Sequence, residues 1–180
     1  MERLIVETVV YRPVEEVYEL LLDFPRYGRY SDYLDAVETL DPGDDEQARY
    51  ALRFAWWKLS YTARSAVTET VPNERIEWTI IDTFEAGGRW VVEEHETLPE
   101  DAPDWAETAT TVRFEASWNP NSVDDSIIDL PRMVSLDWVI TKVKPIVDKE
   151  AERIVRRAVA DLEGRTRQVD LTVETEHVDT

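Results

Sequence analysis

The chain has 180 residues, with 39 acidic and 20 basic side chains, a formal net charge of −19 and no cysteine. The length suits one domain around a single hydrophobic core, and the negative charge argues against binding to the phosphates of nucleic acid or of anionic membranes. Without cysteine there is no disulfide, no thiolate metal site and no cysteine nucleophile.

The basic residues are 16 arginines and four lysines, and the acids are spread along the chain. This composition resembles that of proteins from salt-loving archaea, in which molar salt shortens the Debye length to about 3 Å and screens self-repulsion. An ordinary acidic protein is the alternative. The N-terminal stretch MERLIVETVVYRP is too short and too charged for a signal peptide, and no apolar run approaches the roughly 18 residues of a membrane span. We therefore expect a soluble cytoplasmic protein.

The first 33 residues predict a strand followed by two helices. Residues 4–10 are rich in β-branched side chains and indicate a strand. Pro13 suits the start of a helix, whose apolar stripe over residues 14–22 is ended by Pro25. The stretch PRYGRYSDY then fits a short second helix or a pair of turns, and the three-residue spacing would bring its tyrosines onto roughly one side.

From Leu34 to Trp118 the hydrophobic period changes to two, which is typical of strands. After a strand that begins at Leu34, we expect strands over residues 50–56, 59–67, 75–82, 89–98 and 110–118. Strict alternation indicates one buried and one solvated face. Short turns between consecutive strands favour an antiparallel meander.

A long apolar stripe from Leu136 to Leu162 predicts a C-terminal helix, which Pro145 should kink or break and Gly164 should end. The weak alternation after residue 165 favours a frayed or crossing tail over a regular core strand. We therefore expect one domain over residues 1–165 and a C-terminal tail over residues 166–180.

This order of elements resembles the START-like, helix-grip superfamily, also called SRPBCC. The segment VYRPVEEVYELLLDFPRYGRYSDYLDAVE is similar to the family's opening, and the chain looks most like the polyketide cyclase/dehydrase and coenzyme Q-binding branch. The resemblance implies an α+β helix-grip fold, in which a curved antiparallel sheet of about seven strands wraps around the C-terminal helix and leaves a ligand cavity between them. The sequence departs from the family pattern at Arg12, where Asp or Ser is commoner, and in an extended loop over residues 119–131.

Aromatic side chains supply most of the candidate site, because large rings on a concave sheet suit an apolar pocket. Each ring alone is more simply explained as packed core. The predicted ligand-binding residues are Tyr27, Tyr30, Tyr33, Phe54, Trp56, Trp78, Trp90, Phe114, Trp118 and Trp138, with the tyrosine hydroxyls near the mouth. Asp82 and Glu94 share the inner face of their strands and are candidate polar contacts; the alternative is that they face water.

No pattern in the sequence points to metal or nucleophilic chemistry. The chain has two histidines and neither an HExxH nor a CxxC motif, so we predict no metal site, no cofactor and no catalytic residue. His95 lies opposite Trp90 in the alternation and is expected to face outwards. Arg53, Arg64 and Arg113 are expected to pair with acids across strands. The apolar residues of the 119–131 region and its continuation, Ile127, Ile128, Leu130 and Met133, form either a lid or membrane-touching tip, or the bottom of the core.

Three functions fit these observations. The first is binding or carriage of a hydrophobic small molecule, such as a lipid, an isoprenoid quinone or a polyketide-like aromatic. The second is a polyketide cyclase or dehydratase that uses a buried acid or a tyrosine in the same cavity. The third is a protein-interaction module with a filled cavity, which would expose an apolar patch.

Overall fold

A computed structural model describes residues 1–56, 59–82, 84–122 and 136–177, with side chains from Lys149 onward in the last range. The apolar residues at 127, 128, 130 and 133 lie outside the described residues. Eight strands form one sheet: β1 (Glu2–Val10), β2 (Leu34–Leu40), β3 (Arg49–Trp56), β4 (Leu59–Val71), β5 (Arg75–Ile80), β6 (Ala86–Glu94), β7 (Thr110–Trp118) and β8 (Thr172–His177). The helices are α1 (Val14–Leu22), the 3-10 helices η1 (Phe24–Arg29) and η2 (Pro120–Ser122), and α2 (Leu136–Glu163).

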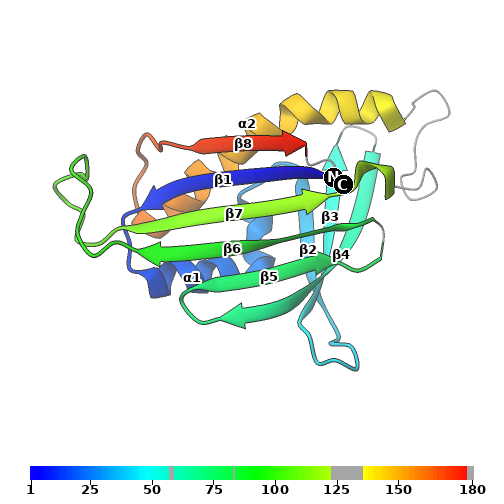
Figure 1. Cartoon of the computed structure of the whole chain (residues 1–180), viewed down its shortest axis with the longest axis horizontal. Coiled ribbons are helices and arrows are strands. Elements are labelled where there is room, and N and C mark those ends of the chain that lie inside the picture. Colours follow the sequence, from blue (N-terminus) through cyan, green and yellow to red (C-terminus); the bar gives the residue numbers. More distant parts are fainter. Residues whose placement is uncertain (57–58, 83, 123–135, 178–180) are drawn as a thin grey trace.

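The strand order is β2-β3-β4-β5-β6-β7-β1-β8, and every neighbouring pair is antiparallel. In Figure 1 the sheet curves, and α1 and the C-terminal half of α2 lie behind it. This confirms the expected α+β helix-grip fold, with a meander from β2 to β7 and β1 beside β7.

The element boundaries follow local chemistry. Pro13 precedes α1, and its carbonyl accepts hydrogen bonds from the amides of Glu16 and Val17. The N–H that proline lacks is not missed, because the first residues of a helix have no intrahelical acceptor for it. Gly164 has a φ of +70°, a left-handed conformation that favours glycine, and it ends α2. Strand β7 has the predicted bounds, whereas β6 begins and ends earlier than expected. Helix α2 runs through Pro145 without a break.

In place of the expected frayed or crossing tail after residue 165, Thr172–His177 form the exposed edge strand β8 against β1, outside the core. The turn after α2 explains this pairing. The Arg167 guanidinium lies 2.6 Å from a carboxylate oxygen of Glu163, whose side chain is fully buried, and it also donates to the Val9 carbonyl at 2.9 Å. These contacts hold the chain alongside β1, where its backbone can form one more row of interstrand hydrogen bonds. Every side chain of β8 is exposed, which explains the weak hydrophobic signal.

The tightly packed core lies towards one end of the sheet. It combines α1 with the last residues of β1 and β6, the first residues of β5 and β7, and the C-terminal part of α2. Its buried members are Val10, Val14, Val17, Tyr18, Leu20, Leu21, Phe24, Tyr30, Ile76, Val92, Val112 and Val159. At the opposite ends of β5 and β7 the inward side chains Trp78, Ile80, Phe114 and Trp118 are only partly buried. The fold therefore has a closed end and a more open end.

Candidate functional site

A row of aromatic rings crosses the concave face of the sheet. Trp90 pairs with Phe114 across β6 and β7, and their ring centroids lie 4.5 Å apart. Trp78 on β5 stacks on Phe114 at 6.0 Å with an interplanar angle of 10°. Because these residues share one face of three neighbouring strands, their rings form a continuous apolar surface. The structure thus brings together three of the predicted ligand-binding residues.

Gly88 makes room for this row. A Cβ atom at this position would lie 2.7 Å from Cζ2 of Trp78 and 2.1 Å from the carbonyl oxygen of Glu115. Both distances are shorter than any packed carbon contact allows. The absence of a side chain at Gly88 therefore lets the Trp78 indole pack closely against β6.

Tyr27 extends the row towards the closed end. Its ring packs on Phe24 at 5.0 Å and edge-on to Trp90 at 6.3 Å. Its hydroxyl donates to the carbonyl of Leu21, and burial raises the pKa of the Tyr27 phenol. The hydroxyl is therefore engaged within the protein, and Tyr27 acts here as a packing residue.

Tyr30 links η1 to α2. Its hydroxyl donates to Oδ2 of Asp161 at 2.5 Å, and the Arg26 guanidinium reaches the same oxygen at 2.8 Å. Burial, together with the hydrogen bond to Asp161, raises the pKa of Tyr30 to about 12. The same contacts lower the pKa of Asp161, through the Tyr30 hydrogen bond first and the Arg26 contacts in addition. A phenol that is so strongly stabilised in its protonated form is a poor proton donor.

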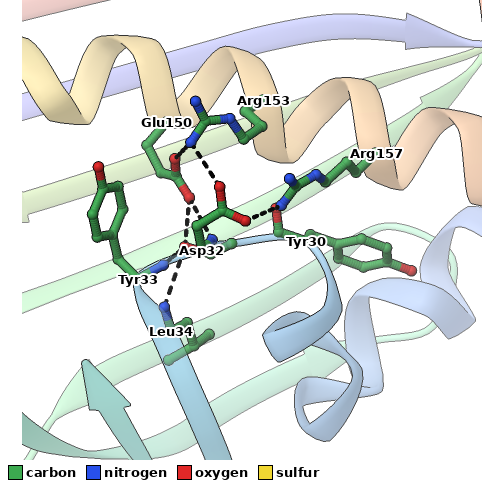
Figure 2. A network of polar contacts seen from close by, with 8 residues as sticks. Tyr30, Asp32, Tyr33, Leu34, Glu150, Arg153 and Arg157 are labelled. Carbon is green, nitrogen blue, oxygen red and sulfur yellow. Dashed lines mark hydrogen bonds and ion pairs between the residues drawn. The ribbon is translucent and has the colours of Figure 1, made fainter. Parts of the chain in front are cut away.

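A second polar cluster fixes α2 to the start of β2 (Figure 2). The buried Glu150 carboxylate accepts hydrogen bonds from the Ser31 hydroxyl at 2.7 Å, the Asp32 amide at 2.9 Å and Arg153 at 2.8 Å. Asp32 pairs in turn with Arg153 at 3.0 Å and Arg157 at 2.8 Å. The hydrogen bond from Arg157, with further charge from both arginines, lowers the pKa of Asp32. We call these five residues the α2 latch.

The ring of Tyr33 points away from the ring of Tyr30. Figure 2 shows its ring on the opposite side of the latch from the ring of Tyr30. The three tyrosines that were expected on one side therefore have three different surroundings. The reason is that η1 ends at Arg29, so its 3-10 repeat includes Tyr27 but neither Tyr30 nor Tyr33.

The open end carries its own aromatic group. Phe54 on β3 pairs with Tyr61 on β4, with ring centroids 6.5 Å apart, and Tyr61 lies 6.2 Å from Phe84 in the turn after β5. Phe54 is 37% exposed. Such exposure is unusual for an inward-facing phenylalanine of a packed core.

Phe84 leads from this group into a pocket of about 530 Å³. The pocket lies at the β5–β6 turn, beside η2, and its lining residues are Thr79, Ile80, Ile81, Asp82, Phe84, Glu85, Ala86 and Ser122. We call it the β5–β6 pocket. Its volume lies within the usual range for small-molecule sites, about 300 to 1,000 Å³. A second hollow, of about 440 Å³ between α1 and α2, is lined mostly by charged side chains and suits an apolar ligand less well.

The remaining predicted residues divide between the two ends of the sheet. Trp56 ends β3 and Trp118 ends β7, both half-buried at the open end, where Trp118 pairs with Ala86 of the pocket. The Trp138 side chain lies outside the described residues. Asp82 lines the pocket, and its Oδ1 accepts a hydrogen bond from the Arg64 amide at 3.1 Å. Glu94 is exposed at the opposite end of β6, roughly 27 Å of strand away from Ala86.

Sequence reasoning did not select most of the pocket residues. The end of β5 and the turn after it contribute Ile80, Ile81, Phe84 and Glu85, and η2 contributes Ser122; only the tertiary structure brings these segments together. One signal was present, because Ile81 and Phe84 are large apolar residues at a strand end, where turns are normally polar.

The convex face of the sheet holds an ion-pair network. Glu115 is contacted by Arg3 at 3.1 Å, Arg89 at 2.9 Å and Arg113 at 2.8 Å. Desolvation opposes ionisation of Glu115, but these three partners outweigh it and lower its pKa. His95 lies beside Thr111 at 2.7 Å on this face. The predicted cross-strand roles of the arginines are confirmed, since Arg113 also pairs with Glu7, and Arg53 and Arg64 pair with Asp35 and Asp82.

The site offers apolar surface and acceptors rather than reactive groups. No set of three or more potential metal ligands occurs among the residues that the structure describes. Among the described residues, every carboxyl group with a shifted pKa has its pKa lowered; these groups are Asp32, Asp45, Glu115 and Asp161. Within the described ranges, no helix has both the length and the apolar character needed to cross a bilayer.

Residues 10–123 match the family model described as polyketide cyclase / dehydrase and lipid transport. This match spans more than half of the chain, and the chain belongs to this family. A search of curated proteins found no match.

Solved structures share the fold. A START superfamily protein from Mycobacterium smegmatis has a TM-score of 0.59 and 15% identity, over 90% of this chain and 99% of that chain. The Zhui aromatase/cyclase from Streptomyces sp. R1128 has a TM-score of 0.60 and 18% identity, over 93% of this chain and 97% of that chain. A protein from Thermus thermophilus has a TM-score of 0.58 and 14% identity, over 90% and 97%. At these identities the likeness shows a common fold.

Proposed function

We propose that this protein binds a hydrophobic small molecule at the open end of the grip, between the concave face of the sheet and the region of α2. The observation that carries the proposal is the partly exposed aromatic group Phe54, Tyr61 and Phe84, which leads into the β5–β6 pocket. Membership of a family whose description includes lipid transport supports the same class of ligand.

The contrast between the two ends of the sheet supports this proposal. At the closed end, Ile76, Val17 and Val10 are between 0% and 2% exposed, which leaves no room for a ligand. At the open end, Phe54 is 37% and Ile81 is 42% exposed. Covering such apolar surface with a ligand is favourable by about 25 cal/mol per Å². A bound apolar molecule would therefore complete the part of the core that the protein leaves open.

A lipid, an isoprenoid quinone and a polyketide-like aromatic are all candidate ligands under this proposal. A cyclase or dehydratase function would need an inward acid that is held in its protonated form. Tyr27 and Tyr30, the most strongly shifted tyrosines, have hydroxyls that donate to Leu21 and Asp161. We therefore favour binding over catalysis.

Binding can be tested with the fluorescent probe N-phenyl-1-naphthylamine and with native mass spectrometry of the protein purified in high salt. We expect the Phe54→Ser variant to bind the probe about threefold to tenfold more weakly, because the ring would contact the ligand. The matched control is Leu98→Ser, which removes a side chain of similar exposure, 41%, outside the pocket. The proposal is wrong if the wild-type protein binds no apolar probe, or if both variants lose affinity equally.

A further inference from the structure

The polar groups of the β5–β6 pocket determine which kind of polar end a ligand can place there. We infer that the ligand ends in a hydrogen-bond donor, a hydroxyl or an amine, and that amphiphiles ending in a carboxylate or another anion are excluded. This inference rests on the proposed binding function, because it concerns the polar end of the same ligand.

The apolar part of the pocket defines where the body of the ligand lies. Ile80, Ile81 and Ala86 line it together with Phe84, whose ring continues the aromatic group of the open end. A chain or ring system that leaves this aromatic group passes next to the β5–β6 turn. The polar end of the ligand is therefore positioned among the polar residues of that turn.

The charged residues that line the pocket are both acids. Asp82 and Glu85 are part of the lining, and no arginine or lysine is among the described residues that form it. Asp82 pairs with Arg64, whose guanidinium lies 3.6 Å from Oδ2 of Asp82 and whose side chain is 59% exposed. An anionic group in the pocket would meet two carboxylates and no cation among these lining residues, so the like charges would repel it.

The hydroxyl donors of the pocket are already engaged. The Ser122 hydroxyl donates to the Asn119 carbonyl at 2.7 Å, and it accepts from the Glu85 amide at 2.9 Å. The Thr79 hydroxyl lies 3.2 Å from the Ala86 carbonyl, to which it donates. Neither hydroxyl is therefore available to donate to a ligand.

Acceptors, in contrast, remain available. Oε2 of Glu85 accepts from the Asn119 side-chain amide at 2.9 Å, whereas Oε1 has no donor among the described residues. Asp82 receives one backbone hydrogen bond, at 3.1 Å from Arg64. A carboxylate can accept up to about four hydrogen bonds. The pocket therefore offers acceptors to a ligand that brings the donor.

The test compares three amphiphiles with the same alkyl chain, namely dodecylamine, dodecanol and dodecanoate, as competitors of N-phenyl-1-naphthylamine below their micellar concentrations. The measurements are made near 1 M KCl, where the Debye length is about 3 Å. At this ionic strength the net charge of the protein is screened, whereas contacts between the ligand and the pocket residues are retained. We expect dodecylamine and dodecanol to bind, and dodecanoate to bind at least about tenfold more weakly than dodecanol.

The double variant Asp82→Asn/Glu85→Gln keeps the shape of both side chains and an oxygen for the hydrogen bonds to Arg64 and Asn119. We expect it to bring the affinity for dodecanoate to within about threefold of that for dodecanol, and to lower the affinity for dodecylamine. The control variant Glu100→Gln/Glu107→Gln removes two exposed charges from the loop before β7 and should keep the wild-type preference.

The possible failures are distinguishable. If the wild-type protein binds all three amphiphiles equally, or if the pocket and control variants behave alike, the inference about the polar end is wrong while the binding function stands. If no amphiphile and no probe binds, the binding function itself is wrong. Circular dichroism of each variant confirms that the fold is retained.

Discussion

Removing the Glu150 carboxylate should weaken the contact between α2 and the start of β2. In the Glu150→Ala variant, the Asp32 amide loses a partner at 2.9 Å and the Ser31 hydroxyl loses one at 2.7 Å. Ser31 is half-buried and Asp32 is exposed, so water can reach both donors and each lost hydrogen bond costs about 1 kcal/mol. Arg153 adds less than about 1 kcal/mol, because its side chain is 44% exposed and keeps its pair with Asp32.

The expected loss in the free energy of unfolding is therefore about 2 kcal/mol, which lowers the melting temperature of a chain of this size by roughly 4 to 8 °C. The measurement is urea or thermal unfolding followed by circular dichroism in 2 M KCl. Glu152→Ala is the matched control, since Glu152 lies on the same helix in an exposed pair with Arg156 and should cost less than about 0.5 kcal/mol. Equal losses in both variants would refute the reasoning that the α2 latch is a buried, specific contact.

Three further outcomes follow from the structure. Gly88→Ala should lower the free energy of unfolding by about 1 to 3 kcal/mol and change the near-ultraviolet circular dichroism of Trp78, because the new Cβ meets the indole and a backbone oxygen. Gly87→Ala, where the nearest atom to a new Cβ is at 3.1 Å, should lower it by less. A larger loss for Gly87→Ala than for Gly88→Ala would contradict the packing argument. Tyr30 has its pKa raised to about 12 from about 10 in the unfolded chain, so its contribution to stability is present below pH 10 and is lost as the pH rises towards 12. The difference in unfolding free energy between the wild type and Tyr30→Phe should therefore narrow over this range, and a constant difference would exclude the hydrogen bond to Asp161 as its source. Finally, the net charge of −19 predicts that the melting temperature rises between about 0.1 and 2 M KCl as self-repulsion is screened, whereas an unchanged melting temperature would show that the acidic surface costs no stability.

Much of the fold could be predicted from the sequence, because local periodicity reflects which face of each element is buried. Strand β7 has its predicted bounds, Thr110–Trp118, since its strict alternation requires one inner and one outer face. Helix α2 was predicted from its apolar stripe, with its end at Gly164. The concave placement of Trp78, Trp90 and Phe114 also followed from the period of two.

Edge strand β8 could not be predicted from its own residues. Its side chains are all exposed, so burial imposes no hydrophobic alternation there and the sequence signal is weak. Its position depends on the backbone ladder with β1 and on the contact of Arg167 with the Val9 carbonyl, across 158 residues of sequence.

The faces of the strands and of the long helix can be read from local sequence, because burial imposes a period that neighbouring residues display. The surroundings of the three tyrosines and the lining of the β5–β6 pocket depend instead on contacts between distant segments. Tyr30 finds Asp161 across 131 residues, and the pocket combines the turn after β5 with Ser122 of η2. Such contacts join segments whose local patterns are independent of one another, and the packing of the whole chain selects which of them meet.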